Sequence, residues 1–392
     1  MIYLDYNATT PICDAAREAM LPYINRFFGN PSSVHAAGRE TRAAVDDARD
    51  KIAALLHAKP GEIIFNSGAT ESCNLGVLGL ARSRAASGSA GGASTKAGHL
   101  ISNKAEHHAV LHAVEHLENH EGFEVTWLDV SKTGMVDLDQ LADSIQPHTK
   151  LVSIMAANNE TGVIQPMREI SRICREHGVW LHSDMVQAFG KCDTDVSLVD
   201  AGSFASHKFY GPKGTGFLFL RSGLPIQPIM FGGAHENQRR PGTENVAGVA
   251  GMAAAAEWVS CDVDAERQRE AQLRDDFWTR IAELFPDAQQ NGDQTHRLGN
   301  TLNISFIGVD SETMLMALDL EGVCASSGSA CMVGSVRASH VLLAMGLPME
   351  SARSAIRFSL GRRTTAEEIA NAADALKRIA KRTKDAREYA VA

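Results

Sequence analysis

The chain has 392 residues, of which 44% are apolar and 22% charged, and its formal net charge at pH 7 is −9. This length allows two domains with a well-buried core, and the negative charge argues against a nucleic-acid surface, which needs basic residues to contact phosphates. No run of 18 apolar residues and no signal-peptide pattern occurs, so we expect neither a membrane span nor export. Seven cysteines without a Cys-x-x-Cys pair suit a reducing compartment, and we predict a cytoplasmic protein.

Strand-like and helical segments alternate through the first two thirds of the chain. The expected buried strands are residues 62–65, 99–102, 151–156, 179–182 and 217–220. Such alternation predicts an α/β fold with a mainly parallel sheet and helices on both faces. Ligands of such sheets bind beyond the carboxyl ends of the strands.

The pattern changes after about residue 258, where helical and charged segments lead into a different arrangement. The strand and helices expected there are residues 300–306, 313–320 and 366–382. They predict a smaller α+β domain. We therefore assign residues 15–258 to a large domain, and residues 1–14 and 259–392 to a small domain.

Polar residues follow the first predicted strand, where the chain turns into a helix. The segment is Asn66-Ser67-Gly68-Ala69-Thr70-Glu71-Ser72. Free backbone N–H groups at the helix start, with the hydroxyls of Ser67 and Thr70, would form a phosphate site. Ordinary capping of the helix by Ser67 or Thr70 explains the same residues equally well.

A carboxylate closes another predicted strand. Asp184 follows the apolar residues 179–182, and Gln187 comes three residues later. A carboxylate buried at a strand end needs a cation or several hydrogen-bond donors, and a protonated pyridine nitrogen would be such a cation. A helix N-cap is the simpler alternative. The turn at residues 158–162, which contains Asn159, also follows a buried strand and would reach the same crevice, although tight-turn chemistry explains it too.

One lysine is the most informative residue of the chain. Lys208 lies between the polar residues Ser206 and His207 and the glycine-rich residues 211–216. Neighbours that lower a lysine's pKa make its amine a covalent catalyst, which carbonyl cofactors such as pyridoxal phosphate (PLP) exploit. The glycines allow backbone to approach a bulky ligand closely. A phosphate-binding or surface turn remains the simpler interpretation of this segment alone.

A cysteine lies among small residues near the end of the chain. Cys331 belongs to Ser326-Ser327-Gly328-Ser329-Ala330-Cys331. A partly exposed thiol is what a cysteine nucleophile requires, although most single unpaired cysteines are structural. Cys324 falls on the strand-like side, and we expect it in the core.

The histidine-rich residues 107–120 indicate a second hypothesis, a metallohydrolase. His108, His112, His116 and His120 recur every four residues on one helix face, and residues 112–116 match the H-x-x-E-H pattern of inverted zinc proteases. No third zinc ligand can be assigned by spacing, and a zinc site would not explain the lysine or the cysteine segment. We therefore predict no metal and expect most of these histidines on a solvated face.

Taken together, the ordered motifs resemble the cysteine desulfurases of the nitrogen-fixation and iron–sulfur-cluster (NifS/IscS) type. The motifs are residues 3–10, 28–33, 67–72, 106–107, 158–162, 182–187, 207–208, 240–245, 326–331 and 356–361. They cover the chain nearly end to end, and their number and order make the resemblance highly specific. Met185 departs from the pattern, because a small residue is usual beside the carboxylate at 184.

The resemblance implies a fold-type I PLP-dependent transferase that works as a homodimer. It implies conversion of L-cysteine to L-alanine, with the sulfur held as a persulfide on an enzyme cysteine. An iron–sulfur scaffold or another sulfur-acceptor protein would then take the sulfur. The nearest alternatives are class-V aminotransferases, which have no use for a cysteine in that segment, selenocysteine lyases, and a non-enzymatic assembly scaffold.

The resemblance also implies roles for individual residues. Lys208 corresponds to the Schiff-base lysine, Cys331 to the persulfide-forming nucleophile, and His107 to the imidazole stacked on the PLP ring. Asp184 corresponds to the partner of the pyridine nitrogen, and Arg357 to the clamp on the substrate carboxylate. The other implied contacts are Thr70 and His207 at the phosphate, Asn159 and Gln187 near the phenolic oxygen with Asn159 also near the substrate, Ala69 and Ser206 elsewhere on the cofactor, and Thr243 from the other subunit.

Overall fold

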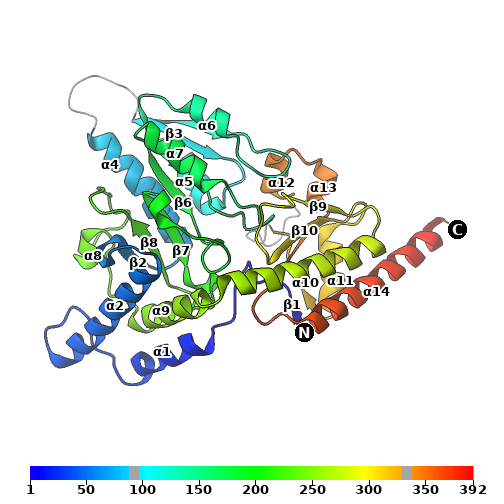
Figure 1. Cartoon of the computed structure of the whole chain (residues 1–392), viewed down its shortest axis with the longest axis horizontal. Helices are drawn as coiled ribbons and strands as arrows, with labels where there is room; N and C mark the ends of the chain where they lie inside the picture. Colours follow the sequence, from blue (N-terminus) through cyan, green and yellow to red (C-terminus); the bar gives the residue numbers. More distant parts are fainter. Residues whose placement is uncertain (88–96, 329–337, 392) are drawn as a thin grey trace.

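The computed structural model describes residues 1–87, 97–328 and 338–391. Its larger part is built around a seven-stranded sheet with the strand order β2-β8-β7-β6-β5-β3-β4 (Figure 1). The strands are β2 (Ile63–Asn66), β3 (Gly98–Asn103), β4 (Phe123–Leu128), β5 (Thr149–Ser153), β6 (Trp180–Asp184), β7 (Ala201–Ala205) and β8 (Gly216–Leu220). β8 runs antiparallel to β2 and β7, and the other neighbouring strands are parallel. The predicted mainly parallel sheet is confirmed.

Helices cover both faces of this sheet because its strands are apolar on both sides. Ile63 and Phe65 of β2 belong to one buried cluster, and Ile64 between them belongs to another, as the two-residue period of a strand requires. The first cluster is covered by α2 (Ala36–Leu55), α6 (Leu138–Ser144), α7 (Met167–Glu176) and α9 (Val246–Ser260). The second is covered by α3 (Ala69–Asn74), the π-helical turn Leu75–Gly79, α4 (Leu80–Ser87) and α5 (His108–His120).

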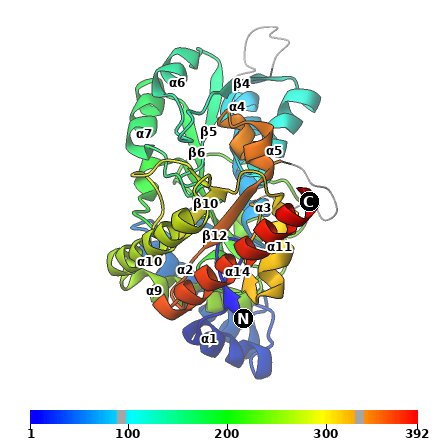
Figure 2. The same cartoon turned by 90° about the vertical axis from the view of Figure 1, so that its right-hand side faces the viewer.

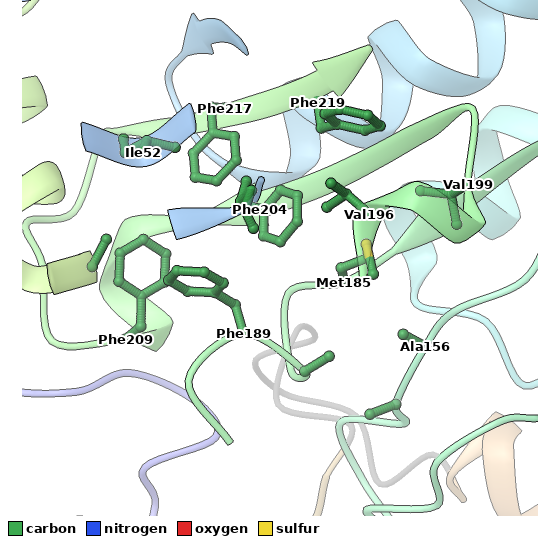
Figure 3. Close-up of a cluster of buried hydrophobic side chains, with 14 of the residues drawn as sticks. Ile52, Ala156, Met185, Phe189, Val196, Val199, Phe204, Phe209, Phe217 and Phe219 are labelled. Carbon is green, nitrogen blue, oxygen red and sulfur yellow. The ribbon is translucent and has the colours of Figure 1, made fainter. Parts of the chain in front are cut away.

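Aromatic side chains fill the first cluster where β7 and β8 meet. Phe204 stacks on Phe217 with ring centroids 4.4 Å apart, and both rings are fully buried (Figure 3). Met185 packs into this cluster near Val196 (Figure 3). The bulky methionine that follows Asp184 is therefore accommodated in the core.

The smaller part contains a three-stranded antiparallel sheet with the order β12-β10-β9. Its strands are β9 (Gln289–Asn291), β10 (Thr301–Ser305) and β12 (Ala355–Ser359), and its helices are α10 (Val263–Leu284), α11 (Ser311–Leu320) and α14 (Ala366–Val391). Phe277 of α10, Ile304 of β10 and Phe358 of β12 share one buried cluster. α10 and α14 lie side by side in both views (Figures 1 and 2).

The N-terminal residues join this smaller part. β1 (Ile2–Tyr3) pairs in parallel with β11 (Val323–Cys324), and α1 (Asp14–Asn25) then packs against α9 of the larger part. The chain thus passes from one part to the other within residues 4–13. The domain division at residues 14 and 258 stays a prediction.

Three further helices are short: α8 (His235–Gln238), α12 (His340–Ala344) and α13 (Met349–Arg353). Single 3-10 turns occupy Pro60–Glu62, Val196–Leu198 and Ser206–Lys208. In the described ranges, no single helix is long and apolar enough to cross a membrane. α9 and α10, which are bent by 74° relative to each other, pass that criterion only when they are joined.

Candidate active site

A cavity of about 630 Å³ lies beyond the carboxyl ends of the parallel strands, as the strand pattern predicts. Residues from both parts of the molecule line it. The lining includes nine of the residues singled out in the sequence: Ala69, Thr70, His107, Asn159, Asp184, Gln187, His207, Lys208 and Arg357. The fold therefore brings together side chains that are almost 300 positions apart in the chain, from Ala69 to Arg357.

The amine of Lys208 is held at the wall of this cavity by the N-terminal segment. Lys208 ends the 3-10 turn that follows β7. Its Nζ donates hydrogen bonds to the backbone oxygens of Asn7, at 2.7 Å, and Ala8, at 2.8 Å. These contacts fix the position of the amine.

The carboxylate of Asp184 closes β6 and is only 7% exposed. Its Oδ1 accepts the backbone N–H of Val186 at 3.0 Å, and the Cys73 thiol lies 3.7 Å from Oδ2. Burial and the neighbouring Asp184 raise the pKa of Cys73, so this thiol stays protonated and donates. Within the described part of the chain, no lysine, arginine or histidine forms an ion pair with Asp184. A buried carboxylate at a cavity wall without a protein cation suits a ligand that carries a positive charge.

His107 precedes α5 and caps it, because its Nδ1 accepts the backbone N–H of Ala109 at 3.1 Å. Burial lowers the pKa of His107, the nearby Asp184 opposes this shift, and Lys208 and His340 add to it. The imidazole is therefore neutral near pH 7. Since Nδ1 is the acceptor, the ring proton belongs on Nε2.

The helix start after β2 was interpreted from the sequence either as a phosphate site or as ordinary helix capping, and its structure differs in detail from both. α3 continues through the π-helical turn into α4, so its first backbone N–H groups head a longer helix. The N-cap is Gly68, at φ +143°, without a side-chain cap, so neither Ser67 nor Thr70 caps the helix. The hydroxyl of Ser67 donates to Glu71 at 2.6 Å. Thr70 and the backbone at Ala69 remain at the cavity for an anionic group.

Arg357 extends from β12 and is only 2% exposed. Its Nη2 donates to the Asp5 carboxylate at 2.7 Å, and its Nη1 donates to the backbone oxygen of Asn159 at 2.9 Å. Its Nε is buried and has no hydrogen-bond partner among the described residues. The guanidinium is thus fixed in position and keeps donors unused, which suits a carboxylate ligand.

Asn7 connects these groups, although sequence reasoning gave it no role. Its backbone oxygen accepts from Lys208 Nζ and from Gln187 Nε2, at 2.7 and 3.0 Å, and its Nδ2 donates to the Asn159 oxygen at 3.2 Å. Asn7 is 1% exposed. A signal was present in the sequence, since a buried amide within the motif at residues 3–10 needs several partners.

Three of the highlighted residues lie elsewhere, and a fourth is not among the described residues. Ser206 does not line the cavity: its Oγ is buried without a partner among the described residues and would lie 2.0 Å from a Cβ on Gly211. Thr243 lines a different surface cavity of about 660 Å³. Cys331 lies outside the described residues. Cys324, which we expected in the core, is partly exposed. The cofactor roles of Ser206 and Thr243 stay predictions.

The histidine-rich helix forms as predicted, but it does not gather a metal site. The rings of His108 and His112 lie 4.9 Å apart, and those of His108 and His340 lie 4.3 Å apart. His116 contacts Glu121 at 3.1 Å. Wherever the structure describes the chain, no three His, Cys, Asp or Glu residues come together in a way that could hold a metal ion. The metallohydrolase hypothesis therefore gains no support from the geometry.

A known protein family and several of its relatives match the chain over nearly its whole length. Residues 2–371 match the family model described as aminotransferase class-V. The chain belongs to this family. Cysteine desulfurase IscS of Dictyoglomus turgidum is 45% identical over 390 residues, which cover 99% of this chain and 96% of the relative. The putative cysteine desulfurase IscS 1 of Bacillus subtilis is 42% identical over 384 residues, with 97% and 99% covered.

Solved structures are also similar to the chain over most of its length. A NifS-like protein superposes with a TM-score of 0.88 at 34% identity, covering 96% of this chain and 98% of the other. SspA in complex with cysteine has a TM-score of 0.80 at 34% identity, with 92% and 99% covered. The predicted resemblance to the cysteine desulfurases of the NifS/IscS type is confirmed, and with it the fold class. This family uses PLP.

Proposed function

We propose that this class-V family member is a PLP-dependent cysteine desulfurase, which converts L-cysteine to L-alanine and retains the sulfur on Cys331 as a persulfide. One observation carries the proposal: a single cavity holds the amine of Lys208, the buried carboxylate of Asp184 without a protein cation, and the fixed guanidinium of Arg357. The extensive similarity to cysteine desulfurases supports the same activity.

The side chains of the cavity fit PLP. Asp184 would pair with the protonated ring nitrogen, and Lys208 would hold the aldehyde carbon. The backbone at Ala69, the hydroxyl of Thr70 and the ring of His207 suit the phosphate. When bound, PLP supplies an electron sink for the charge that develops on the amino acid's α-carbon.

The protein's own groups bind the substrate and move its protons. Arg357 binds the carboxylate of L-cysteine through donors that Asp5 and Asn159 leave unused. The amine of Lys208 removes the α-proton and later returns a proton to the product carbon. The Nε2 proton of neutral His107 is available to the substrate sulfur.

Sulfur transfer requires a second nucleophile, which we assign to Cys331. Its thiolate attacks the substrate sulfur, so that an S–S bond forms, the C–S bond breaks, and the bonding electron pair stays on the alanine precursor. Protonation of this precursor releases L-alanine. Cys331 is three residues from Gly328, which lines the cavity, and three residues of chain span at most about 11 Å. The sequence separation therefore allows the thiol to reach the substrate.

We further propose a homodimer. Phe28, Val34 and Phe231 are 92%, 89% and 91% exposed. The segments that carry them are adjacent, because Ser32 Oγ lies 3.3 Å from Nε2 of His235. Exposed apolar groups gathered in this way favour a protein interface. The partner subunit would then contribute Thr243 to the site.

The sulfur acceptor that we propose is an iron–sulfur scaffold or another sulfur-acceptor protein, because a persulfide sulfur is ready for transfer to a second thiol. We place the enzyme in the cytoplasm. Six cysteines lie within the described residues, and all six are free thiols, which supports a reducing environment.

The test is to incubate the purified protein with PLP, L-cysteine and dithiothreitol and to quantify the products. Alanine and sulfide should form in equal amounts. Sulfide accompanied by pyruvate and ammonia would instead indicate elimination, and a 2-oxo acid formed only with an added amino acceptor would indicate an aminotransferase. A metallohydrolase or a non-enzymatic scaffold would yield neither alanine nor sulfide.

A further inference from the structure

Lys191 has no assigned role in the reaction, yet its amine reaches the residues of the cavity. It follows Gln187 by four positions in the turn after β6. Its Nζ donates to Oε1 of Gln187 at 2.5 Å and to Oδ1 of Asn7 at 3.2 Å. Gln187 is 3% exposed and lines the cavity. Lys191 therefore contacts a cavity residue from behind.

The charged amine of Lys191 determines the orientation of the Gln187 amide. An ammonium group only donates hydrogen bonds, so the amide oxygen must face Lys191 and the NH₂ group must face away. One hydrogen of Nε2 goes to the backbone oxygen of Asn7, at 3.0 Å. The second hydrogen remains available. Gln187 thus offers the cavity a donor.

We propose that Lys191 is a positioning residue that fixes the Gln187 amide with its N–H donor toward the cavity, where it would meet the phenolic oxygen of PLP. This inference rests on the proposed function, because the phenolic oxygen belongs to a PLP held in this cavity. Without Lys191, only the backbone oxygen of Asn7 still favours this orientation, so the amide turns over more readily. Its oxygen would then face the phenolic oxygen, and two acceptors repel each other.

Lys191 also carries a charge, so any test must separate its charge from its effect on the amide. Burial lowers the pKa of Lys191 to about 7, with Lys208 and Arg357 adding to the shift and Glu270 opposing it. At about pH 6 the amine is mostly charged. A double-mutant cycle at this pH separates the two effects, because an effect of charge alone does not depend on the side chain at position 187.

The cycle consists of the wild type, Lys191→Met, Gln187→Ala and the double variant. The apoproteins are titrated with PLP in the absence of L-cysteine, and both the dissociation constant and the visible absorption maximum are recorded. Lys191→Met should weaken PLP binding by about tenfold, as expected for a lost hydrogen bond to a charged group, and shift the absorption maximum. In the Gln187→Ala background the same change should have no further effect.

Gln187→Glu tests the idea with Lys191 intact. The carboxylate keeps its contact with Lys191 and offers only acceptors to the cavity, so it should weaken PLP binding at least as much as Lys191→Met does. Equal effects of Lys191→Met in both backgrounds, or wild-type PLP binding by Gln187→Glu, would contradict this inference alone. A wild-type protein that binds no PLP would contradict the proposed function as well.

Discussion

The guanidinium of Arg357 lies 2.7 Å from the carboxylate of Asp5, which joins the start of the chain to β12. The arginine side chain is 3% exposed and the aspartate side chain is 19% exposed. The residue that we assign to the substrate carboxylate is therefore already paired with an anion in the protein. This pairing explains how a buried positive charge is tolerated before the substrate arrives.

Asp5→Ala should lower the free energy of unfolding by about 3 kcal/mol, because it leaves the buried charge of Arg357 without its anion. Urea denaturation measures the change. Added L-alanine should restore part of it, since its carboxylate replaces that of Asp5. The matched control is Asp14→Ala: Asp14 and Arg17 form an exposed pair at 3.1 Å, and their loss should cost at most about 1 kcal/mol. Equal effects of the two changes would contradict the assignment.

Lys208→Ala should abolish the visible absorbance of covalently bound PLP, because no other described amine has the same position at the cavity wall. Spectra of washed protein measure it. Lys213 also lines the cavity, so Lys213→Ala is the control and should keep the absorbance. Cofactor found covalently attached to Lys213 in the Lys208→Ala variant would overturn the choice of lysine.

Asp184→Asn should keep the fold, since an amide oxygen can still accept the Val186 N–H. It should lower kcat/KM for L-cysteine by roughly 10- to 100-fold, because losing a hydrogen bond to a charged group costs about 1.5–3 kcal/mol. Asp200→Asn is the control. Asp200 precedes β7 at the other end of the sheet, where it accepts the Leu181 N–H at 2.8 Å. Similar kinetics for both variants would reduce Asp184 to a structural residue.

Acid should destabilise the protein through His182. Its ring is buried and its nitrogens lie 2.8 and 2.9 Å from the hydroxyls of Ser153 and Ser203. Burial lowers the pKa of His182 to about 3. The unfolded chain, with a histidine pKa of about 6.5, binds this proton more readily. Stability from this group is therefore complete above about pH 6.5 and is lost toward pH 3, at up to about 1.4 kcal/mol per pH unit.

Urea midpoints between pH 7 and pH 4 test this dependence, with His182→Asn as the comparison. The variant should start from a lower stability at pH 7 and show a shallower loss on acidification, because its side chain no longer titrates. Parallel curves for the two proteins would show that His182 makes no contribution to the pH dependence.

The sequence indicated five of the seven strands of the large sheet and missed β4 and β7. β8, with its Phe and Leu residues, was predicted to within one residue. β7 reads Ala-Gly-Ser-Phe-Ala, and its low strand propensity hides it, although all five residues are buried. The strand predicted at residues 151–156 is β5, which ends at Ser153. Beyond that end, Ile154 and Ala156 still donate backbone hydrogen bonds to the β6 segment. Hydrogen bonding between neighbouring strands therefore decides where such a strand ends.

The charged residues of the site were easier to predict from the sequence than the residues that hydrogen-bond to them or orient their neighbours. Lys208, Asp184 and Arg357 follow from motif resemblance and from the cost of burying charge. Asn7 acts through hydrogen bonds to segments at least 150 residues away, which its place in the motif at residues 3–10 does not specify. Lys191 acts through the orientation of the Gln187 side chain and has no local sequence signal. Ser67, whose hydroxyl was predicted to contact a phosphate, lines the cavity and donates its hydroxyl proton to Glu71.

Cys331→Ser should separate binding from sulfur transfer. Lys208, Asp184 and Arg357 are unchanged in this variant, so PLP binding and the spectral response to L-cysteine should persist. Sulfide release should cease, because a serine hydroxyl is scarcely ionised near neutral pH and attacks sulfur poorly. Cys324→Ser is the control, and it should keep the desulfurase activity. Sulfide release by Cys331→Ser at the wild-type rate would contradict the assignment.

The persulfide on Cys331 can be observed by mass spectrometry of the enzyme after a short pulse of L-cysteine without reductant. We expect one added sulfur atom on the peptide that contains Cys331, with one alanine released per sulfur bound. Treatment with dithiothreitol should remove this atom as sulfide. An added sulfur on Cys324 or on another cysteine, or alanine formed while Cys331 stays unmodified, would show that Cys331 is not the nucleophile.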